Sequence, residues 1–456
     1  MIYEDLCEII KDKNRVIDGV EIEKEYLTDG LKREFGEADT LVFPISTDEV
    51  VNILKYANNN LINITPRGAG TGLIGATIPI NRGIVLDFSK MNKIIQLDEE
   101  NLTIVVEPGV KLNDLQQYVE SKGYFYPPDP GEKNATIGGN ISTNAGGMRA
   151  IKYGVTRNYV KKLQVVLADG QLLDVGSDTI KDSSGLDIKD LIIGSEGTLG
   201  VITKVKLKLV PKPLKNISAI VPFRSLDEGI STVLKIIKEN VNPTAIEFIE
   251  RSVIRKSEDY LGKKFPCGIG EAFLLLTFDG DNIEIEKNCN KVAKVVKENG
   301  ALDFIILEDI EDIEDAWSIR GALVSAVESV SEEEPIDIVV PISNIAKFVE
   351  YTKTLEGKYG IEIVSFGHAG DGNVHLCVVR NDIEINEWKE KNHQLLSELY
   401  LKSYELNGLP SGEHGIGLNK KEYFKMTTDK VNIEIMKSIK KVFDSNRILN
   451  ADKVFE

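Results

Sequence analysis

The sequence predicts an α+β protein of several domains, and three features of the chain support this class. At 456 residues the chain is long for a single hydrophobic core. Short runs of β-forming residues alternate with segments of helical periodicity in a mixed order, which is typical of α+β folds. The pattern changes after Pro211 and Pro213, and we place a domain boundary there, near residue 215.

The first region combines a helix with short strands and a hairpin. Residues 1–40 are charged and helical in pattern, and a second helix is predicted to begin after Ser46, which stands three residues before Glu49 as in a capping box. The pair Asp169-Gly170 marks a hairpin turn. The expected strands are residues 61–65, 83–88, 103–109, the two arms of 162–175, and two more within 190–213.

The second region predicts a sheet domain with helices on one of its faces. Its expected strands are residues 272–280, 304–309, 337–342, 361–367 and 374–380. Helical patterns cover residues 285–300 and 342–360. The last segment, residues 431–456, is predicted to be an amphipathic helix followed by an irregular tail.

Composition narrows the class of function. The formal net charge of −17 disfavours a nucleic-acid partner and a basic membrane-docking face. The first residues carry neither the basic start nor the apolar run of a signal peptide, and no apolar stretch is long enough to span a membrane, so we expect a cytoplasmic protein. The four cysteines are scattered without a C-x-x-C pair, so they cannot form a sequence-local zinc or iron–sulfur site.

Three glycine-rich loops indicate a large ligand that contains phosphate. The first, "TPRGAGTGLIGA", matches the dinucleotide fingerprint at Gly70, Gly72 and Gly75, but Pro79 and β-branched residues follow where a Rossmann helix should begin. The Walker pattern also fails, because no Gly-Lys-Ser/Thr follows. Backbone amides can nonetheless approach a pyrophosphate closely at such glycines. The loops at 127–147 and 194–203 have the same character, so we expect a ligand wrapped along all three.

Three of the four histidines lie in two short glycine-rich segments, "GHAGDGNVHL" and "SGEHGIG". His368, His375 and Glu413 offer two imidazoles and a carboxylate, a ligand set typical of a catalytic divalent metal site. His414 is then best interpreted as a general base, since neutral imidazole suits proton transfer near neutral pH. His393 lies in a helical pattern and is expected to be solvated.

The motifs "PRGAGTGL", "PPDPG", "IGGNISTNAGG", "GSEGTLGVIT", "GHAGDGNVHL" and "SGEHGIG" occur in this order over nearly the whole chain. In this the sequence resembles the FAD-linked 2-hydroxyacid dehydrogenases, the D-lactate dehydrogenase and glycolate oxidase branch of the vanillyl-alcohol-oxidase (PCMH-type) flavoproteins. The resemblance implies an FAD-binding domain of two α/β subdomains at 1–215, a cap domain with an antiparallel sheet at 216–415, and a C-terminal segment, 416–456, that returns to the FAD domain.

Matched motif by motif, the resemblance implies the residues that hold FAD. Because no histidine precedes His368, non-covalent FAD is expected, although a cysteine link stays open. The pyrophosphate would be cradled by Arg67, Gly68, Ala69, Gly70, Thr71 and Gly72; the flavin and ribityl chain would be lined by Pro127, Asp129, Thr136, Gly139, Ser142, Asn144 and Gly147; and the adenine side would be held by Glu196, Gly197 and Ile202.

The resemblance also implies the reaction. Zinc, iron or manganese would be bound by His368, His375 and Glu413, and Arg320 in "DAWSIRGAL" would pair with the substrate carboxylate. His414 would take the hydroxyl proton while C2 delivers hydride to flavin N5, leaving a 2-keto acid. Asn373 either hydrogen-bonds the substrate or stabilises a turn.

The sequence indicates the substrate and the electron acceptor less directly than it indicates the reaction. Dicarboxylate-specific relatives carry an extra cation before the strand that matches "DIVVP", whereas this chain has the acidic "SEEEPIDIVVP", so we expect lactate, in its D form, or glycolate rather than D-2-hydroxyglutarate. A soluble electron-transferring flavoprotein or an iron–sulfur subunit is the expected acceptor. Two other hypotheses stay open at this point: a metal-dependent hydrolase that binds a nucleotide, and a flavin-binding subunit whose partner performs the catalysis.

Overall fold

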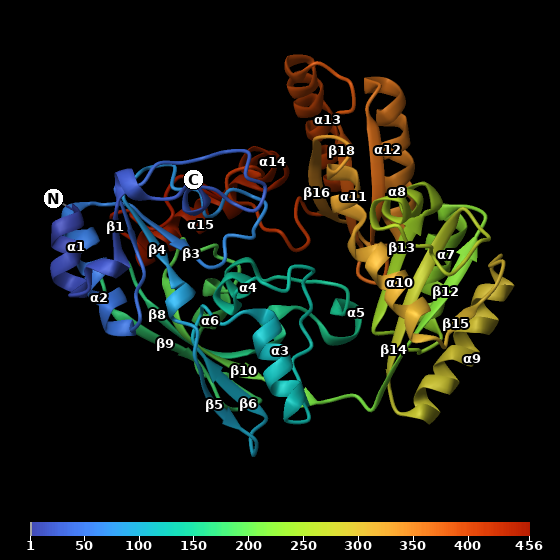
Figure 1. Cartoon of the computed structure of the whole chain (residues 1–456), viewed down its shortest axis with the longest axis horizontal. Coiled ribbons are helices and arrows are strands. Elements are labelled where there is room, and N and C mark those ends of the chain that lie inside the picture. Colours follow the sequence, from blue (N-terminus) through green and yellow to red (C-terminus); the bar gives the residue numbers. More distant parts are fainter. Residues whose placement is uncertain (1) are drawn as a thin grey trace. The chain divides into compact units, whose positions relative to one another are not determined.

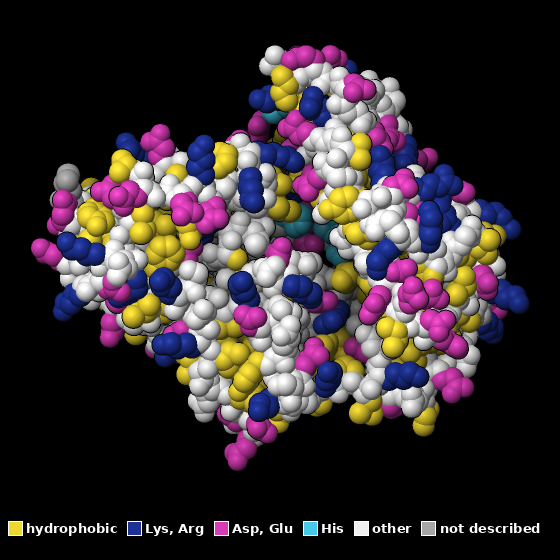
Figure 2. Space-filling view, viewed as in Figure 1, with side chains coloured by type: hydrophobic (Ala, Val, Ile, Leu, Met, Phe, Trp, Pro, Cys, Tyr) yellow, Lys and Arg dark blue, Asp and Glu magenta, His cyan; other side chains and the backbone are white. Residues whose placement is uncertain are grey.

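The computed structural model describes residues 2–456, and the chain forms two compact units. The first unit contains residues 1–146, 155–212 and 413–456, and the second contains 147–154 and 213–412. Among the described residues, no helix is both long enough and apolar enough to cross a membrane. On the face shown in Figure 2, lysines and arginines are interspersed with acidic side chains over each unit.

The first unit contains two main sheets of different character and a short antiparallel pairing of β7 (Tyr124–Phe125) with β11 (Val210–Pro211). A four-stranded mixed sheet has the order β1-β2-β4-β3, in which β4 runs parallel to both β2 and β3. A five-stranded antiparallel sheet has the order β5-β6-β10-β8-β9. The strands are β1 (Val16–Asp18), β2 (Thr40–Val42), β3 (Ile64–Arg67), β4 (Ile84–Asp87), β5 (Ile94–Asp98), β6 (Thr103–Val106), β8 (Val160–Val166), β9 (Leu172–Gly176) and β10 (Val201–Lys208).

The predicted capping box identifies a helix correctly. Helix α2 (Thr47–Asn60) begins after Ser46, whose hydroxyl accepts a hydrogen bond from the Glu49 amide at 3.2 Å. The Glu49 carboxylate does not close the box on Ser46; it accepts from both terminal nitrogens of Arg15, at 2.7 and 2.8 Å. The helical prediction for residues 1–40 holds only for α1 (Ile2–Ile10). Beyond it, Asp12 and Asp18 accept hydrogen bonds from amides two residues ahead, which favours short turns over a helix.

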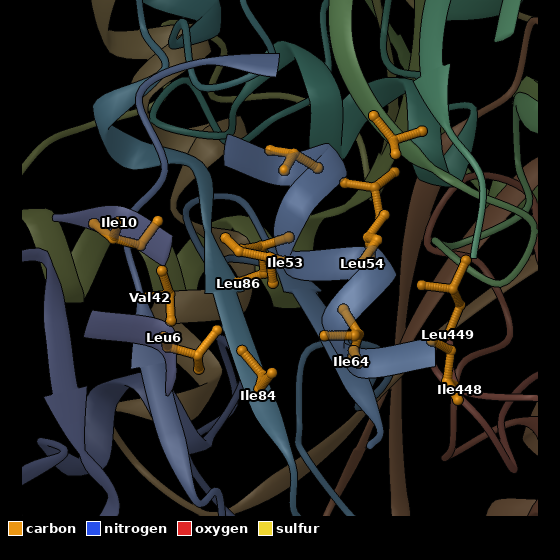
Figure 3. Packing of buried hydrophobic residues seen from close by; sticks show 14 of the residues in the cluster. Leu6, Ile10, Val42, Ile53, Leu54, Ile64, Ile84, Leu86, Ile448 and Leu449 are labelled. Atoms are coloured by element: carbon orange, nitrogen blue, oxygen red, sulfur yellow. The ribbon is translucent and has the colours of Figure 1, made fainter. Parts of the chain in front are cut away.

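The C-terminal segment packs into the core of the first unit. Figure 3 shows Ile448 and Leu449 beside residues of β3 and α2. The same segment contains helices α14 (Lys421–Thr427) and α15 (Lys430–Phe443), and the buried ammonium group of Lys440 on α15 donates to the carbonyls of Thr198 and Leu449. The C-terminal segment is therefore part of this unit's hydrophobic core.

The second unit is a seven-stranded, fully antiparallel sheet with the order β15-β12-β14-β13-β17-β18-β16 (Figure 1). All strands predicted from the sequence in this region are present, and two more, β12 and β13, were not predicted. The strands are β12 (Lys215–Phe223), β13 (Ala245–Glu250), β14 (Ala272–Gly280), β15 (Ile305–Leu307), β16 (Glu333–Val339), β17 (Glu362–His368) and β18 (Asn373–Val379).

Helices cover both faces of this sheet, so the expectation of one covered face is wrong. One face packs on α8 (Arg251–Leu261), α10 (Ile310–Gly321) and α11 (Leu323–Glu328), whose apolar residues share a core with Ile249 and Phe366. The opposite face packs on α7 (Leu226–Lys238), where Gly229 lies against the Phe223 ring. The reason lies in strands such as β14, whose residues 272–279 are buried on both sides and need cover on both.

Leu449→Ala should destabilise the first unit by about 2–5 kcal/mol, the usual cost of a cavity at a fully buried leucine. Val442, on the same C-terminal segment but 82% exposed, provides the matched control, and Val442→Ala should change stability by less than about 0.5 kcal/mol. Urea unfolding followed by circular dichroism measures both. Equal effects of the two substitutions would show that the C-terminal segment is not part of the core.

Candidate active site

In the first unit the three predicted glycine loops lie together. A Cβ on Gly68 of the first loop would stand 2.2 Å from the hydroxyl of Thr136 in the second loop, so only glycine permits this approach. The third loop is tied to the second by two backbone hydrogen bonds, from Gly194 to Ile141 (3.0 Å) and from Glu196 to Ser142 (2.8 Å). The sequence therefore brings all three loops to one region of the unit.

The backbone of these loops fits a phosphate-bearing cofactor. Gly70 has φ +70°, where a side chain would be strained, and a Cβ on Gly72 would meet nothing within 4 Å, so the loop offers open, side-chain-free backbone. Ala69 and Gly72 are exposed, and Thr71 is half-buried. Arg67 is different, because its guanidinium is buried and donates to the carbonyls of Thr28 (2.5 Å) and Glu25 (2.6 Å). The Arg67 side chain therefore stabilises the loop through hydrogen bonds to the backbone of another segment.

Most other side chains assigned to the cofactor also make hydrogen bonds within the protein. Asp129 forms an ion pair with Lys133, and the Ser142 hydroxyl donates to the Gly138 carbonyl. Asn144 adopts a left-handed conformation at the end of helix α4 (Ile137–Thr143). What these loops leave for a ligand is mainly backbone. The remaining residues of the set lie in or beside the same loops: Pro127, Gly139, Gly147, Gly197 and Ile202, the last on β10.

Glu196 holds the segment that carries His414. Its carboxylate is buried and accepts hydrogen bonds from the amides of Ile416 (2.7 Å) and Gly417 (2.8 Å). Burial raises the pKa of Glu196 to about 7, against the lowering effect of these hydrogen bonds and of nearby Lys453. Burial in turn lowers the pKa of Lys453 to about 7, and the charge of Glu196 opposes that shift. Glu196 thus stabilises the segment that carries His414. The sequence analysis, which assigned Glu196 to the adenine side of FAD, did not predict this contact.

In the second unit, strand register places the predicted active-site residues on one face of the sheet. Glu247 of β13 pairs with His368 of β17, which pairs with Asn373 of β18. One step along the strands, His375 pairs with Asp337 of β16. Because residues paired across strands and residues two apart share a face, these five side chains project from the same surface.

The two imidazoles point their Nε2 atoms at each other, 3.2 Å apart, with ring planes at 88°. The Nδ1 atom of His368 lies 2.7 Å from Oε1 of Glu247. The other Glu247 oxygen accepts from Nε (2.8 Å) and Nη2 (2.6 Å) of Arg320 on α10. Burial acts to raise the pKa of Glu247, but the charges and hydrogen bonds of His368 and Arg320 outweigh it, so the net pKa lies below its usual range.

A second buried carboxylate, that of Asp337, binds other polar groups on the same face of the sheet. Asp337 accepts hydrogen bonds from the side-chain amide of Asn373 (2.6 Å), the hydroxyl of Ser411 (2.7 Å) and the backbone amide of Gly412 (3.1 Å). Asn373 also donates to the Ile338 carbonyl, so its amide hydrogens are committed to the protein and its oxygen is the group left for a ligand. Gly412 is the last residue of the second unit, and Glu413 follows it directly.

Family models match both parts of the chain. The model described as FAD binding domain matches residues 38–176, and the model described as FAD linked oxidases, C-terminal domain, matches residues 212–454. The chain belongs to the FAD-linked oxidases. The resemblance noted from the sequence is confirmed, and the chain is an FAD-dependent enzyme of the 2-hydroxyacid dehydrogenase family. This FAD-linked enzyme class replaces the hypothesis of a nucleotide-binding hydrolase.

Curated relatives align over nearly their full length. The chain is 43% identical to D-lactate dehydrogenase of Anaerostipes hadrus, covering 96% of this chain and 94% of that protein. It is 40% identical to the glycolate oxidase protein GlcD of Bacillus subtilis (strain 168), with 91% and 89% covered. A D-2-hydroxyglutarate dehydrogenase of Stutzerimonas stutzeri (strain A1501) is 32% identical, with 99% and 98% covered.

The fold is that of PCMH-type flavoproteins. The solved structure of p-cresol methylhydroxylase with substrate bound superposes with a TM-score of 0.83, covering 98% of this chain and 95% of that one at 17% identity. This likeness confirms the predicted fold class of an FAD-binding domain of two subdomains with a sheet domain.

Sequence reasoning missed two buried carboxylates of this candidate site. Glu247 and Asp337 lie in the apolar strand segments "TAIEFIE" and "PIDIVV", and both side chains are fully buried. An acidic residue inside a buried strand needs a partner, so this pattern was the available signal. It went unused for Glu247 because β13 itself was not predicted.

Glu196→Gln should loosen the segment that carries His414. A glutamine offers one acceptor oxygen, and its amide hydrogens face the backbone N–H groups of Ile416 and Gly417, so one hydrogen bond is lost at a cost of about 1–3 kcal/mol. Hydrogen exchange of these two amides should accelerate by roughly tenfold or more. Glu100→Gln, at an exposed turn, is the control. Unchanged exchange at Ile416 and Gly417 in Glu196→Gln would contradict the assigned role.

Proposed function

We propose that this FAD-dependent enzyme oxidises a small 2-hydroxy acid to the 2-keto acid with the help of a divalent metal ion. D-lactate is the first candidate and glycolate the second. The observation that carries the proposal is the pair of imidazole Nε2 atoms, 3.2 Å apart on the same sheet face as the carboxylate that holds Arg320.

The imidazole pair suits a shared metal ion. Two nitrogens bound to one tetrahedral zinc at about 2.0–2.1 Å stand about 3.3 Å apart, close to the observed separation. His368, His375 and Glu413 form a donor set that could hold an ion. Imidazole and carboxylate ligands fit zinc and also iron or manganese. A divalent ion would supply positive charge that lowers the pKa of a nearby hydroxyl.

Chain connectivity supports Glu413 as the third ligand. Gly412 is fixed by its hydrogen bond to Asp337, which pairs in register with His375. The next residue is Glu413, and consecutive Cα atoms are about 3.8 Å apart. The anchored end of the second unit therefore delivers a carboxylate beside the strand that carries one of the imidazoles.

Arg320 is positioned to bind the substrate carboxylate. Its Nε and Nη2 atoms are engaged by Glu247, while its Nη1 atom has no hydrogen-bond partner among residues 2–456. The side chain is 8% exposed, so an ion pair with a substrate carboxylate would form in a low-dielectric setting. This arrangement selects acids over neutral alcohols.

His414 is the proposed general base. It follows the proposed ligand Glu413, and Glu196 holds its segment through Ile416 and Gly417. A neutral imidazole accepts the hydroxyl proton, and bound FAD supplies the two-electron acceptor for the oxidation. Asn373 offers its side-chain oxygen as an acceptor for a substrate hydroxyl, since its amide hydrogens are committed to Asp337 and Ile338.

The acidic residues at the start of β16 favour a monocarboxylate. Glu332 precedes the strand and is paired with Arg380 at 2.9 Å, and Glu333 and Glu334 are the first two residues of the strand. The segment therefore adds no cation that could bind a second substrate carboxylate. D-2-hydroxyglutarate, a dicarboxylate, is the alternative substrate, because a dehydrogenase of that name is similar over 99% of this chain.

The electron acceptor is proposed to be a soluble protein, either an electron-transferring flavoprotein or an iron–sulfur subunit. The four cysteines are buried, Cys7 on α1, Cys267 in a loop, Cys289 on α9 (Asn282–Glu298) and Cys377 on β18, and within residues 2–456 the side chains grouped so that they could hold a metal include no cysteine. The cytoplasmic location also stays a prediction.

Anaerobic titration of the purified, FAD-loaded protein with D-lactate, L-lactate, glycolate and D-2-hydroxyglutarate tests the proposal. D-lactate should bleach the visible flavin band at the lowest concentration. Prior treatment with a chelator should abolish bleaching, and zinc or manganese should restore it. Bleaching by D-2-hydroxyglutarate alone would overturn the monocarboxylate assignment, and chelator-resistant bleaching would overturn metal assistance.

A variant separates catalysis from cofactor binding in the same assay. His414→Ala should retain FAD but reduce the rate of bleaching by about 10²- to 10⁴-fold, the usual contribution of a positioned base. His393→Ala, at an exposed helical histidine, is the control and should leave the rate unchanged. Full activity of His414→Ala would exclude the assigned base.

A further inference from the structure

Glu247 contacts both halves of the proposed substrate site. It lies on β13 with its side chain fully buried, in register with His368. Its Oε1 atom is 2.7 Å from Nδ1 of His368, and its Oε2 atom lies 2.6 Å from Nη2 of Arg320. One carboxylate thus joins a proposed metal ligand to the proposed substrate-binding arginine.

The contact with His368 determines which ring nitrogen carries the proton. An ionised carboxylate can only accept hydrogen bonds, so Nδ1 of His368 must be the donor. A neutral imidazole has one N–H group, so a proton on Nδ1 places the acceptor lone pair on Nε2. That Nε2 atom is the one that lies 3.2 Å from Nε2 of His375. A carboxylate behind a histidine ligand in this way fixes the ring and raises its basicity.

The contact with Arg320 fixes the plane of the guanidinium group. Nε and Nη2 both donate to the same oxygen, and the guanidinium carbon lies 5.2 Å from the centre of the Phe366 ring. These contacts leave Nη1 as the donor directed away from Glu247. Without the carboxylate, a buried arginine would have to find another acceptor and would change its orientation.

We propose that Glu247 is a positioning residue that sets the tautomer of His368 and the orientation of Arg320, so that metal affinity and substrate affinity both depend on this one carboxylate. The inference rests on the proposed function and adds the residue on which its two binding steps converge. A Glu247 that served only as a buried ion-pair partner would affect stability, but it would leave metal affinity unchanged.

The test uses Glu247→Gln in the FAD-loaded protein, because glutamine keeps the shape and places a donor where an acceptor stood. Zinc affinity is measured by competition with a chromophoric chelator and should fall by about 10- to 100-fold, the usual effect of losing such a partner. With metal held at saturation, the KM for D-lactate should rise at least tenfold and kcat should fall less. Wild-type zinc affinity in this variant would overturn the proposal.

Glu250→Gln is the matched control. Glu250 ends the same strand but lies on the opposite face from Glu247, where it contacts Ser365 (3.1 Å) and Lys353 (3.3 Å). Its substitution should leave zinc affinity and KM at wild-type values. Equal losses in both variants would assign the effect to strand β13 and not to the carboxylate of Glu247.

A spectroscopic measurement decides the tautomer without metal or turnover. In metal-free protein labelled with ¹⁵N-histidine, the wild type should show His368 protonated at Nδ1, and Glu247→Gln should lose that single tautomer. If Glu247→Gln does not fold, as judged by thermal unfolding, Glu247→Asp takes its place and should show a smaller shift in the same direction. If the wild type binds no zinc or manganese, the metal part of the proposed function fails, while the tautomer comparison still decides the role of Glu247.

Discussion

The buried carboxylate of Glu247 must be neutralised by its neighbours, and the arrangement of the second unit's site follows from that requirement. An ionised group in the interior is tolerated only with charged partners and full hydrogen bonding. Arg320, from a covering helix, provides the charge, and both Arg320 and His368, from the adjacent strand, provide hydrogen bonds. Because antiparallel register also places His375 and Asn373 on this face, the two proposed metal ligands, the arginine proposed to bind the substrate and the amide of Asn373 lie on strands and a helix and not on loops.

In the first unit, the three glycine loops offer mainly backbone groups for contact with FAD. Its three glycine loops pack so closely that side chains are excluded at Gly68, while Gly72 is left open. Side chains that look like ligands in the sequence, Arg67 above all, are used to brace the loops. The carboxylate of Glu196 then ties the loops to the segment of His414, which links cofactor binding to the proposed base within one unit.

Much of this could be predicted, because local patterns determine local structure. The helix start at Ser46, the Asp169-Gly170 hairpin and five of the seven strands of the second unit were predicted from propensity and period. The glycine loops and the histidine segments identified the family. The predictions that failed concern residues whose structure depends on distant partners. They are the helix expected after residue 10, the missed strand β13 and the role of Arg67 in stabilising its loop, and no local pattern reveals such contacts. The glutamate within the apolar segment of β13 was the one feature of the sequence that indicated such a contact.

The central claim is that two imidazoles on one sheet face bind a metal ion for 2-hydroxy acid oxidation. X-ray absorption at the zinc edge of the zinc-loaded, FAD-containing protein tests it most directly. The account predicts imidazole scattering from two histidines at about 2.0–2.1 Å together with oxygen ligands. It also predicts loss of one imidazole contribution in His375→Ala. A spectrum without imidazole scattering, or one that His375→Ala leaves unchanged, would contradict the account.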